Sequence, residues 1–137
     1  MKSRSESLIR LKKFQVDEKR RQVTQIEMMI ADFERMASEL DQQIDIEQQK
    51  TGISDVAHFA YSTFAKAAIA RRDNLRRSAD ELKGQLADAQ DALAEALEKL
   101  KKMELLGDRD QQRERAGRNT REQPGLTRIG LMGASGA

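Results

Sequence analysis

Few side chains in this sequence could do chemistry. The chain has no cysteine and one histidine, His58, so it lacks a thiol nucleophile and a thiolate metal site. In the antiparallel helical hairpin that the apolar spacing predicts, Glu47 lies opposite His58. One carboxylate beside one imidazole is too few ligands for a zinc site. A solvated or ion-paired contact is the simpler interpretation. No glycine-rich phosphate-binding loop occurs, so we expect no catalytic residue, no cofactor and no metal.

A basic run is the second candidate, with Arg71, Arg72, Arg76 and Arg77 close together. Clustered arginines can hold phosphates, but binding of single strands usually adds aromatic stacking, and no aromatic residue interrupts this run. The formal charge of the whole chain is only +2. We therefore expect no nucleic-acid partner and keep a basic-helix nucleic-acid binder as the weaker alternative.

These side chains are positioned by helices, because apolar residues recur at alternating spacings of three and four in both halves of the chain. Such heptad seams are typical of coiled coils. The sequence predicts an all-α fold, with two long helices of about 75 Å each in an antiparallel coiled-coil hairpin. The first seam contains Ile9, Val16, Val23, Ile26, Ile30, Phe33, Ala37, Leu40 and Ile44, and the second contains Leu75, Ala79, Leu82, Leu86, Ala89, Leu93, Ala96, Leu100 and Met103.

Gly52 predicts where the chain turns. Glycine readily takes the left-handed conformation that ends a helix, and Ser54 or Asp55 can cap the next one. We predict a turn at about residues 51–55. Facing residues would then have numbers that sum to 105, which pairs Val23 with Leu82, Ile26 with Ala79, Ile30 with Leu75, Phe33 with Arg72, Ala37 with Ala68, Leu40 with Ala65 and Ile44 with Tyr61.

The composition changes at Gly107. Six of the eight glycines and the only proline, Pro124, lie in residues 107–137, a stretch too poor in apolar side chains to offset its chain entropy. We expect a hairpin domain over 1–106 and a disordered tail over 107–137. Because no apolar run resembles a signal peptide or is long enough to span a bilayer, a cytoplasmic protein without membrane insertion is expected.

Apolar residues off the seams are candidates for partner contacts, because clusters of exposed apolar side chains mark docking surfaces. Lys12 and Lys19 occupy seam positions facing Leu93 and Leu86, so the end far from the turn either packs loosely or lets these lysines reach water and set the register. The candidates are Leu8, Leu11, Phe14, Leu97, Leu105 and Leu106 near the chain ends, Ile46, Phe59, Phe64 and Ile69 near the turn, and Met28, Met29 and Met36 farther down the first helix.

Five segments of the sequence have a recognisable combination: Leu8-Ile9-Arg10-Leu11, the basic stretch from Lys12 to Arg21, His58-Phe59-Ala60-Tyr61, Phe64-Ala65-Lys66-Ala67-Ala68 and Arg71-Arg72-Asp73-Asn74-Leu75. Together they resemble the FliJ family of flagellar type III export proteins. The segments after the turn are most similar to the α-proteobacterial branch. The likeness covers roughly residues 1–106.

The resemblance implies a non-enzymatic stalk similar to the central stalk of rotary ATPases. Such a protein binds the ring of the flagellar export ATPase, links it to the membrane export-gate protein and handles export chaperones, at the cytoplasmic face of the inner membrane at the flagellar base. By this likeness Leu8, Leu11, Phe14, Leu93 and Leu97 would enter the ATPase ring. Phe59, Tyr61, Phe64 and Arg72 would face the gate.

A homodimeric coiled-coil scaffold is the alternative from another class, because two chains could exchange helices through the same seams. The mirror symmetry of the seams about Gly52 favours a monomeric hairpin. A constant monomer mass over a concentration series would exclude the dimer.

Overall fold

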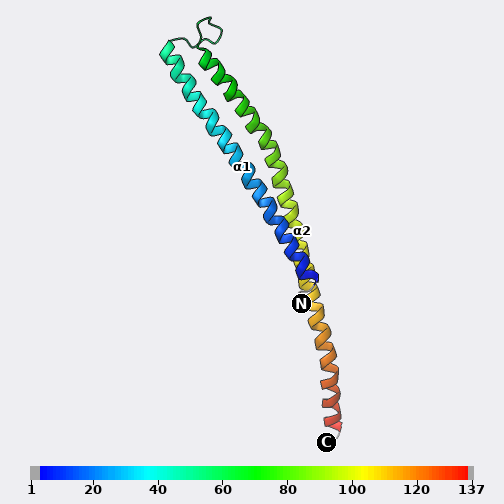
Figure 1. Ribbon diagram of the computed structural model, residues 1–137. Coiled ribbons are helices and arrows are strands. Elements are labelled where there is room, and N and C mark those ends of the chain that lie inside the picture. Colours follow the sequence, from blue (N-terminus) through cyan, green and yellow to red (C-terminus); the bar gives the residue numbers. More distant parts are fainter. Residues whose placement is uncertain (1–3, 136–137) are drawn as a thin grey trace. The chain divides into compact units, whose positions relative to one another are not determined.

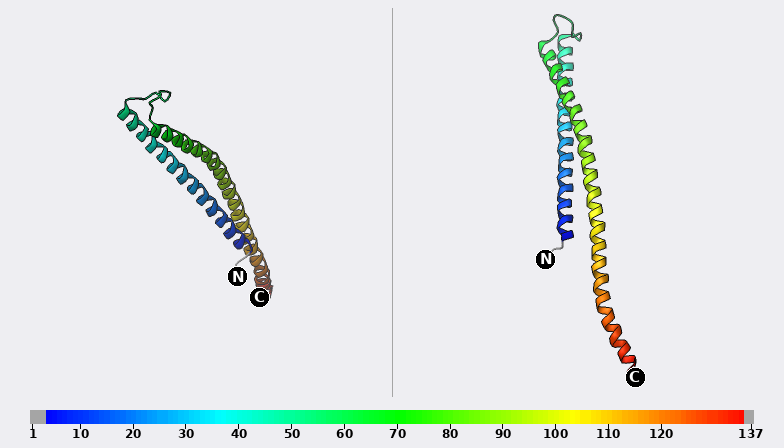
Figure 2. Two further views of the ribbon diagram at one scale, coloured as in Figure 1. Left: turned by 45° about the horizontal axis from the view of Figure 1, so that its top comes forward. Right: turned by 90° about the vertical axis from the view of Figure 1, so that its right-hand side faces the viewer.

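The computed structural model describes residues 4–135, with side chains described through Arg118. These residues form two helices, α1 (Arg4–Thr51) and α2 (Thr63–Ser135), and no strand (Figure 1). The chain divides into a terminal unit, Met1–Val16 with Ala96–Ala137, and a loop unit, Asp17–Glu95. Within each unit α1 and α2 run antiparallel (Figure 2), which confirms the predicted all-α fold of two long, packed helices.

Both predicted seams form the contact between the helices. The buried apolar residues are Val16, Val23, Ile30, Ala37, Leu40, Ile44, Tyr61, Ala65, Ala68, Ala79 and Leu82. The remaining seam residues, from Ile9 on α1 to Met103 on α2, are half-buried. Lys12 and Lys19 are half-buried as well, in keeping with the seam positions that the heptad pattern gives them.

The connection between the helices is longer than the predicted turn. Gly52 has a φ of 71° and its N–H donates to the carbonyl of Gln48 at 2.9 Å, so α1 ends as expected. Asp55, however, caps only a local turn, in which its Oδ1 accepts from the N–H of Ala57 at 2.9 Å. The cap of α2 is Ser62, whose Oγ accepts from the N–H of Ala65 at 3.2 Å.

Contacts with α1 hold the end of this connection. The hydroxyl of the buried Tyr61 accepts a hydrogen bond from Gln48 Nε2 at 2.8 Å. Ser62 Oγ donates to Glu47 Oε1 at 3.0 Å. The second helix therefore begins at Thr63 instead of residue 56, because these two contacts fix residues 61 and 62 against the last turns of α1.

The longer connection shifts the register, and the predicted pairing is wrong. Glu47 meets Ser62, so numbers sum to 109 beside the connection. Glu34 meets Lys83 farther along, so they sum to 117 there. The prediction of 105 is off by four residues at the connection and by twelve at Glu34, about three helical turns.

In the terminal unit the pairing passes the predicted boundary at residue 106. Ser5 Oγ donates to Asp110 Oδ2 at 3.3 Å. The buried Gly107 lies so close to Ile9 that a Cβ at this glycine would be 3.0 Å from the Ile9 Cδ1. The α2 backbone continues to Ser135. Most of the predicted disordered tail, from residue 119 on, lies outside the residues whose side chains are described.

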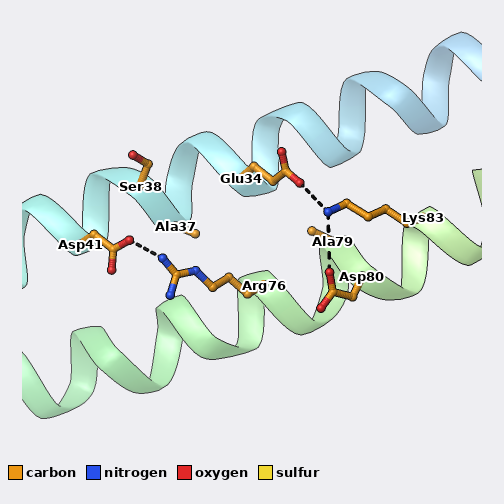
Figure 3. A pocket seen from close by; sticks show the side chains of 8 residues that line it. All are labelled: Glu34, Ala37, Ser38, Asp41, Arg76, Ala79, Asp80 and Lys83. Atoms are coloured by element: carbon orange, nitrogen blue, oxygen red, sulfur yellow. Dashed lines mark hydrogen bonds and ion pairs between the residues drawn. The ribbon is translucent and has the colours of Figure 1, made fainter.

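A disulfide between two new cysteines tests the register. Ala37 and Ala79 are both buried between the helices (Figure 3), so Ala37→Cys with Ala79→Cys should form an intramolecular bridge under mild oxidation, because bridged Cα atoms are usually about 4.4–6.8 Å apart. Mass spectrometry and non-reducing gels provide the measurement. The control pair Ile30→Cys with Leu75→Cys, taken from the 105 register, should stay reduced in the monomer. A bridge between residues 30 and 75 would contradict the register described here.

Candidate functional site

Ion pairs cross one edge of the loop unit. Arg72 Nη1 lies 2.9 Å from Asp41 Oδ1, and Arg76 pairs with the other oxygen of the same carboxylate. About two helical turns farther on, Lys83 Nζ lies 3.0 Å from Glu34 Oε1 and 3.7 Å from Asp80 Oδ1 (Figure 3). The pairs made by Asp41 and Glu34 join the two helices along this edge, whereas the Lys83–Asp80 pair lies within α2.

A shallow groove lies between these ion pairs. Ala37 and Ala79 form its floor, and Ser38 is its only hydroxyl side chain. Its charged groups are paired with one another, and its lining contains no histidine. The groove therefore has the features of a helix–helix contact.

The ion pairs also shift the pKa of two basic side chains. The pKa of Arg72 is raised, chiefly by its hydrogen bond to Asp41, and the pKa of Lys83 is raised, chiefly by its hydrogen bond to Glu34. A base whose pKa is raised on folding stabilises the folded state below its ordinary pKa, and loses that contribution only as the pH rises through the raised value. Both ordinary values are strongly alkaline, so the ion pairs are expected to persist across the neutral range.

Two of the proposed gate residues, Tyr61 and Arg72, make contacts with other residues of the hairpin. Tyr61 is only 5% exposed and accepts the hydrogen bond from Gln48. Arg72 pairs with Asp41 and Asp73, so the prediction that it faces Phe33 is wrong. The shifted register is the reason, because it brings Asp41 within reach of Arg72.

The other two proposed gate residues are accessible. Phe59 is 96% exposed and Phe64 is 57% exposed. The ring of His58 stacks on Phe59 with centroids 4.7 Å apart, and its Nδ1 accepts from the N–H of Ala60 at 3.0 Å. The predicted pair of His58 with Glu47 is therefore wrong, since that carboxylate accepts from Ser62.

Together with two aliphatic neighbours, these rings form what we call the loop surface: Ile46, Val56, Phe59 and Phe64, all exposed. Val56 was not predicted to be exposed, because the predicted turn ended at residue 55 and left Val56 inside the second helix. Ile69 was predicted to lie off the seam, whereas it is half-buried and packs against Leu40, Ile44 and Ala68. A longer connection accounts for the exposed valine, and the shifted register accounts for the covered isoleucine.

The proposed ATPase-binding residues divide between the two units. Leu8, Leu11, Phe14 and Leu97 belong to the terminal unit, and all are exposed, Phe14 by 57%. Leu93 belongs to the loop unit, where it is a half-buried seam residue. We call the exposed apolar residues of the terminal unit the terminal surface: Leu8, Leu11, Phe14, Leu97, Leu105 and Leu106.

Among the described residues, no group of three or more histidine, aspartate or glutamate side chains could hold a metal ion. In the same part of the chain, no helix is both long enough and apolar enough to cross a bilayer. Two exposed apolar surfaces, the terminal surface and the loop surface, are thus present on a helical hairpin, and Met28, Met29 and Met36 are exposed outside both.

An antiparallel helical hairpin with such surfaces is typical of a protein that works by binding other proteins. The family model of the flagellar FliJ protein matches residues 1–126. The chain belongs to this family, which confirms the resemblance to the FliJ family and extends it beyond residue 106. The likeness to the α-proteobacterial branch stays a prediction. Proteins of the FliJ family are structural components of the flagellar protein export apparatus, and the family is not a known enzyme family. No curated protein and no solved structure matches the chain.

Proposed function

We propose that this protein is a monomeric connector within the flagellar export apparatus. Its terminal surface binds the ring of the export ATPase, its loop surface binds the membrane export gate, and it assists in handling export chaperones. It works at the cytoplasmic face of the inner membrane at the flagellar base. Membership of the FliJ family supports the setting, and the two exposed apolar surfaces support the contacts.

The observation that carries the ATPase contact is the exposure of six large apolar side chains in the terminal unit. They project in several directions, because successive residues on a helix are about 100° apart. Leu8 and Leu106 each precede a residue of the helix–helix contact, Ile9 and Gly107. Phe14, five residues beyond Ile9, points to another side of α1. A partner that surrounds the terminal unit would cover more of these side chains than a flat one, and an ATPase ring is such a partner.

Binding of this kind can influence ATP hydrolysis without supplying any catalytic group. A hairpin inside a ring touches the subunits unequally, and it shifts each subunit between nucleotide states only as far as it binds one state more tightly than the other. The ATPase performs the hydrolysis. The hairpin changes how often each state is populated.

The gate contact rests on the loop surface. Exposed aromatic side chains are common anchors of interfaces, where a few residues carry most of the binding energy. Phe59 is almost fully exposed, while Tyr61 and Ser62 hold the end of its segment against Gln48 and Glu47. The connection is thus anchored before a partner arrives, which lowers the ordering cost of binding.

Purified components test this proposal. The chain should increase ring assembly and turnover of the export ATPase from the same cell, and it should bind the immobilised cytoplasmic part of the gate. Phe59→Ser with Phe64→Ser should weaken gate binding by at least about tenfold, since two anchors are lost, and should leave the effect on the ATPase unchanged. Met28→Ser is the matched control, because Met28 is 63% exposed but lies outside both surfaces. A similar loss of gate binding with the control would refute the loop surface as the gate site.

A further inference from the structure

The two units differ in charge although the whole chain is nearly neutral. In the terminal unit, residues 4–16 and 96–118 carry eleven basic and six acidic side chains, a formal charge of +5. In the loop unit, residues 17–95 carry eleven basic and sixteen acidic side chains, a formal charge of −5. The formal charge of +2 for the full sequence conceals this separation, which favours different partners for the two units.

In the terminal unit the cations lie beside the exposed leucines. Ile9 lies against Gly107, so residues displaced equally from these two positions lie on the same side of the antiparallel pair. One residue before each position stand Leu8 and Leu106. The residues five positions before Ile9 and Gly107 are Arg4 and Lys102, and those two positions after them are Leu11 and Arg109. This side of the terminal unit therefore presents leucines next to basic side chains.

We propose that the partner surface which receives the terminal surface is an acidic one, in which carboxylates surround an apolar contact region. The inference rests on the proposed function, since it specifies the chemistry of the ATPase surface that binds this unit. Apolar anchors supply the affinity, whereas the complementary charges raise the association rate and exclude partners of the wrong sign.

An anionic lipid surface would offer the same charge, but it fits the terminal unit less well. A helix that lies on a membrane presents its apolar side chains along one face. Here Phe14 and Leu105 are also exposed, by 57% and 55%, and neither is at the position of Leu8 and Leu106 relative to the helix contact. A flat bilayer would leave part of the terminal surface in water, whereas an enclosing protein surface would not.

Binding kinetics of the full chain on the assembled export ATPase test the inference. Raising the salt from 50 to 300 mM NaCl should weaken binding by about tenfold or more, mainly through slower association, because salt screens exposed charges. Arg4→Glu, Lys102→Glu and Arg109→Glu together should weaken binding at 50 mM by a similar factor. The glutamine versions of the same three changes should lie between this variant and the wild type.

The matched control is a triple reversal in the loop unit, Lys66→Glu, Arg71→Glu and Arg77→Glu, at three exposed positions. It changes the net charge equally and should leave ATPase binding unaltered. Circular dichroism establishes that every variant is folded.

The outcomes separate this inference from the proposed function. Suppose that neither salt nor the terminal reversal changes the affinity for the ATPase, but that the Leu8, Leu11 and Phe14 serine variant loses binding. This result would overturn the inference of an acidic partner surface and would still support the proposed ATPase contact. Absence of ATPase binding at any salt would overturn both. Binding to phosphatidylglycerol vesicles that the terminal reversal abolishes, without a change in ATPase binding, would assign the cations to lipid and overturn the inference. An equal loss of ATPase binding in the terminal and loop reversals would also overturn the inference, because the change in net charge alone would then explain both results.

Discussion

Replacing Leu8, Leu11 and Phe14 together by serine is expected to abolish stimulation of the export ATPase while the hairpin stays folded. These side chains are exposed by 38%, 49% and 57%, so few contacts within the chain are lost. If they include the anchors of the interface, their removal costs at least about 2 kcal/mol of binding free energy, or roughly 30-fold in Kd. Circular dichroism reports the fold, and ring assembly and ATP turnover report the contact.

Three methionines provide the control for this prediction. Met28, Met29 and Met36 are also exposed, by 63%, 41% and 38%, but they belong to the loop unit. Changing all three to serine should leave the stimulation intact. Undiminished stimulation by the folded Leu8, Leu11 and Phe14 variant would place the ATPase contact elsewhere on the chain.

Leu82→Ala is expected to cause a large loss of stability. Leu82 is 8% exposed, and removing a buried leucine side chain costs about 2–4 kcal/mol through lost burial and the cavity left behind. A two-helix hairpin buries a single seam, so this loss is a large part of its free energy of unfolding. Urea denaturation followed by circular dichroism gives the value.

The matched control is Leu105→Ala, the same change at a residue that is 55% exposed. Its cost should stay within about 0.5 kcal/mol, as for most surface substitutions. Similar losses for the two variants would mean that the seam at Leu82 is packed no better than the surface.

The sequence by itself determined the helices and the faces they bury. A heptad seam depends on residues three and four apart in one helix, so Val23, Ile30 and Leu82 could be assigned to the contact before any partner helix was known. The exposed residues follow from the same periodicity, since Leu8, Phe14 and Met28 lie off the stripe. All six residues of the terminal surface and three of the four residues of the loop surface were therefore identified from the sequence, as was the absence of cysteine and of a glycine-rich phosphate loop.

Only the tertiary structure decided where the chain turns and which residues face each other. Ser54, Asp55 and Ser62 are all acceptable caps by residue type, and Ser62 is selected because it also donates to Glu47 across the hairpin. The seams cannot resolve the register, because an offset of four residues is close to one helical turn and an offset of twelve is about three turns, so seam faces seam again in both cases. Arg72 then meets Asp41 instead of Phe33, since contacts between distant segments fix the register that the local repeat leaves open.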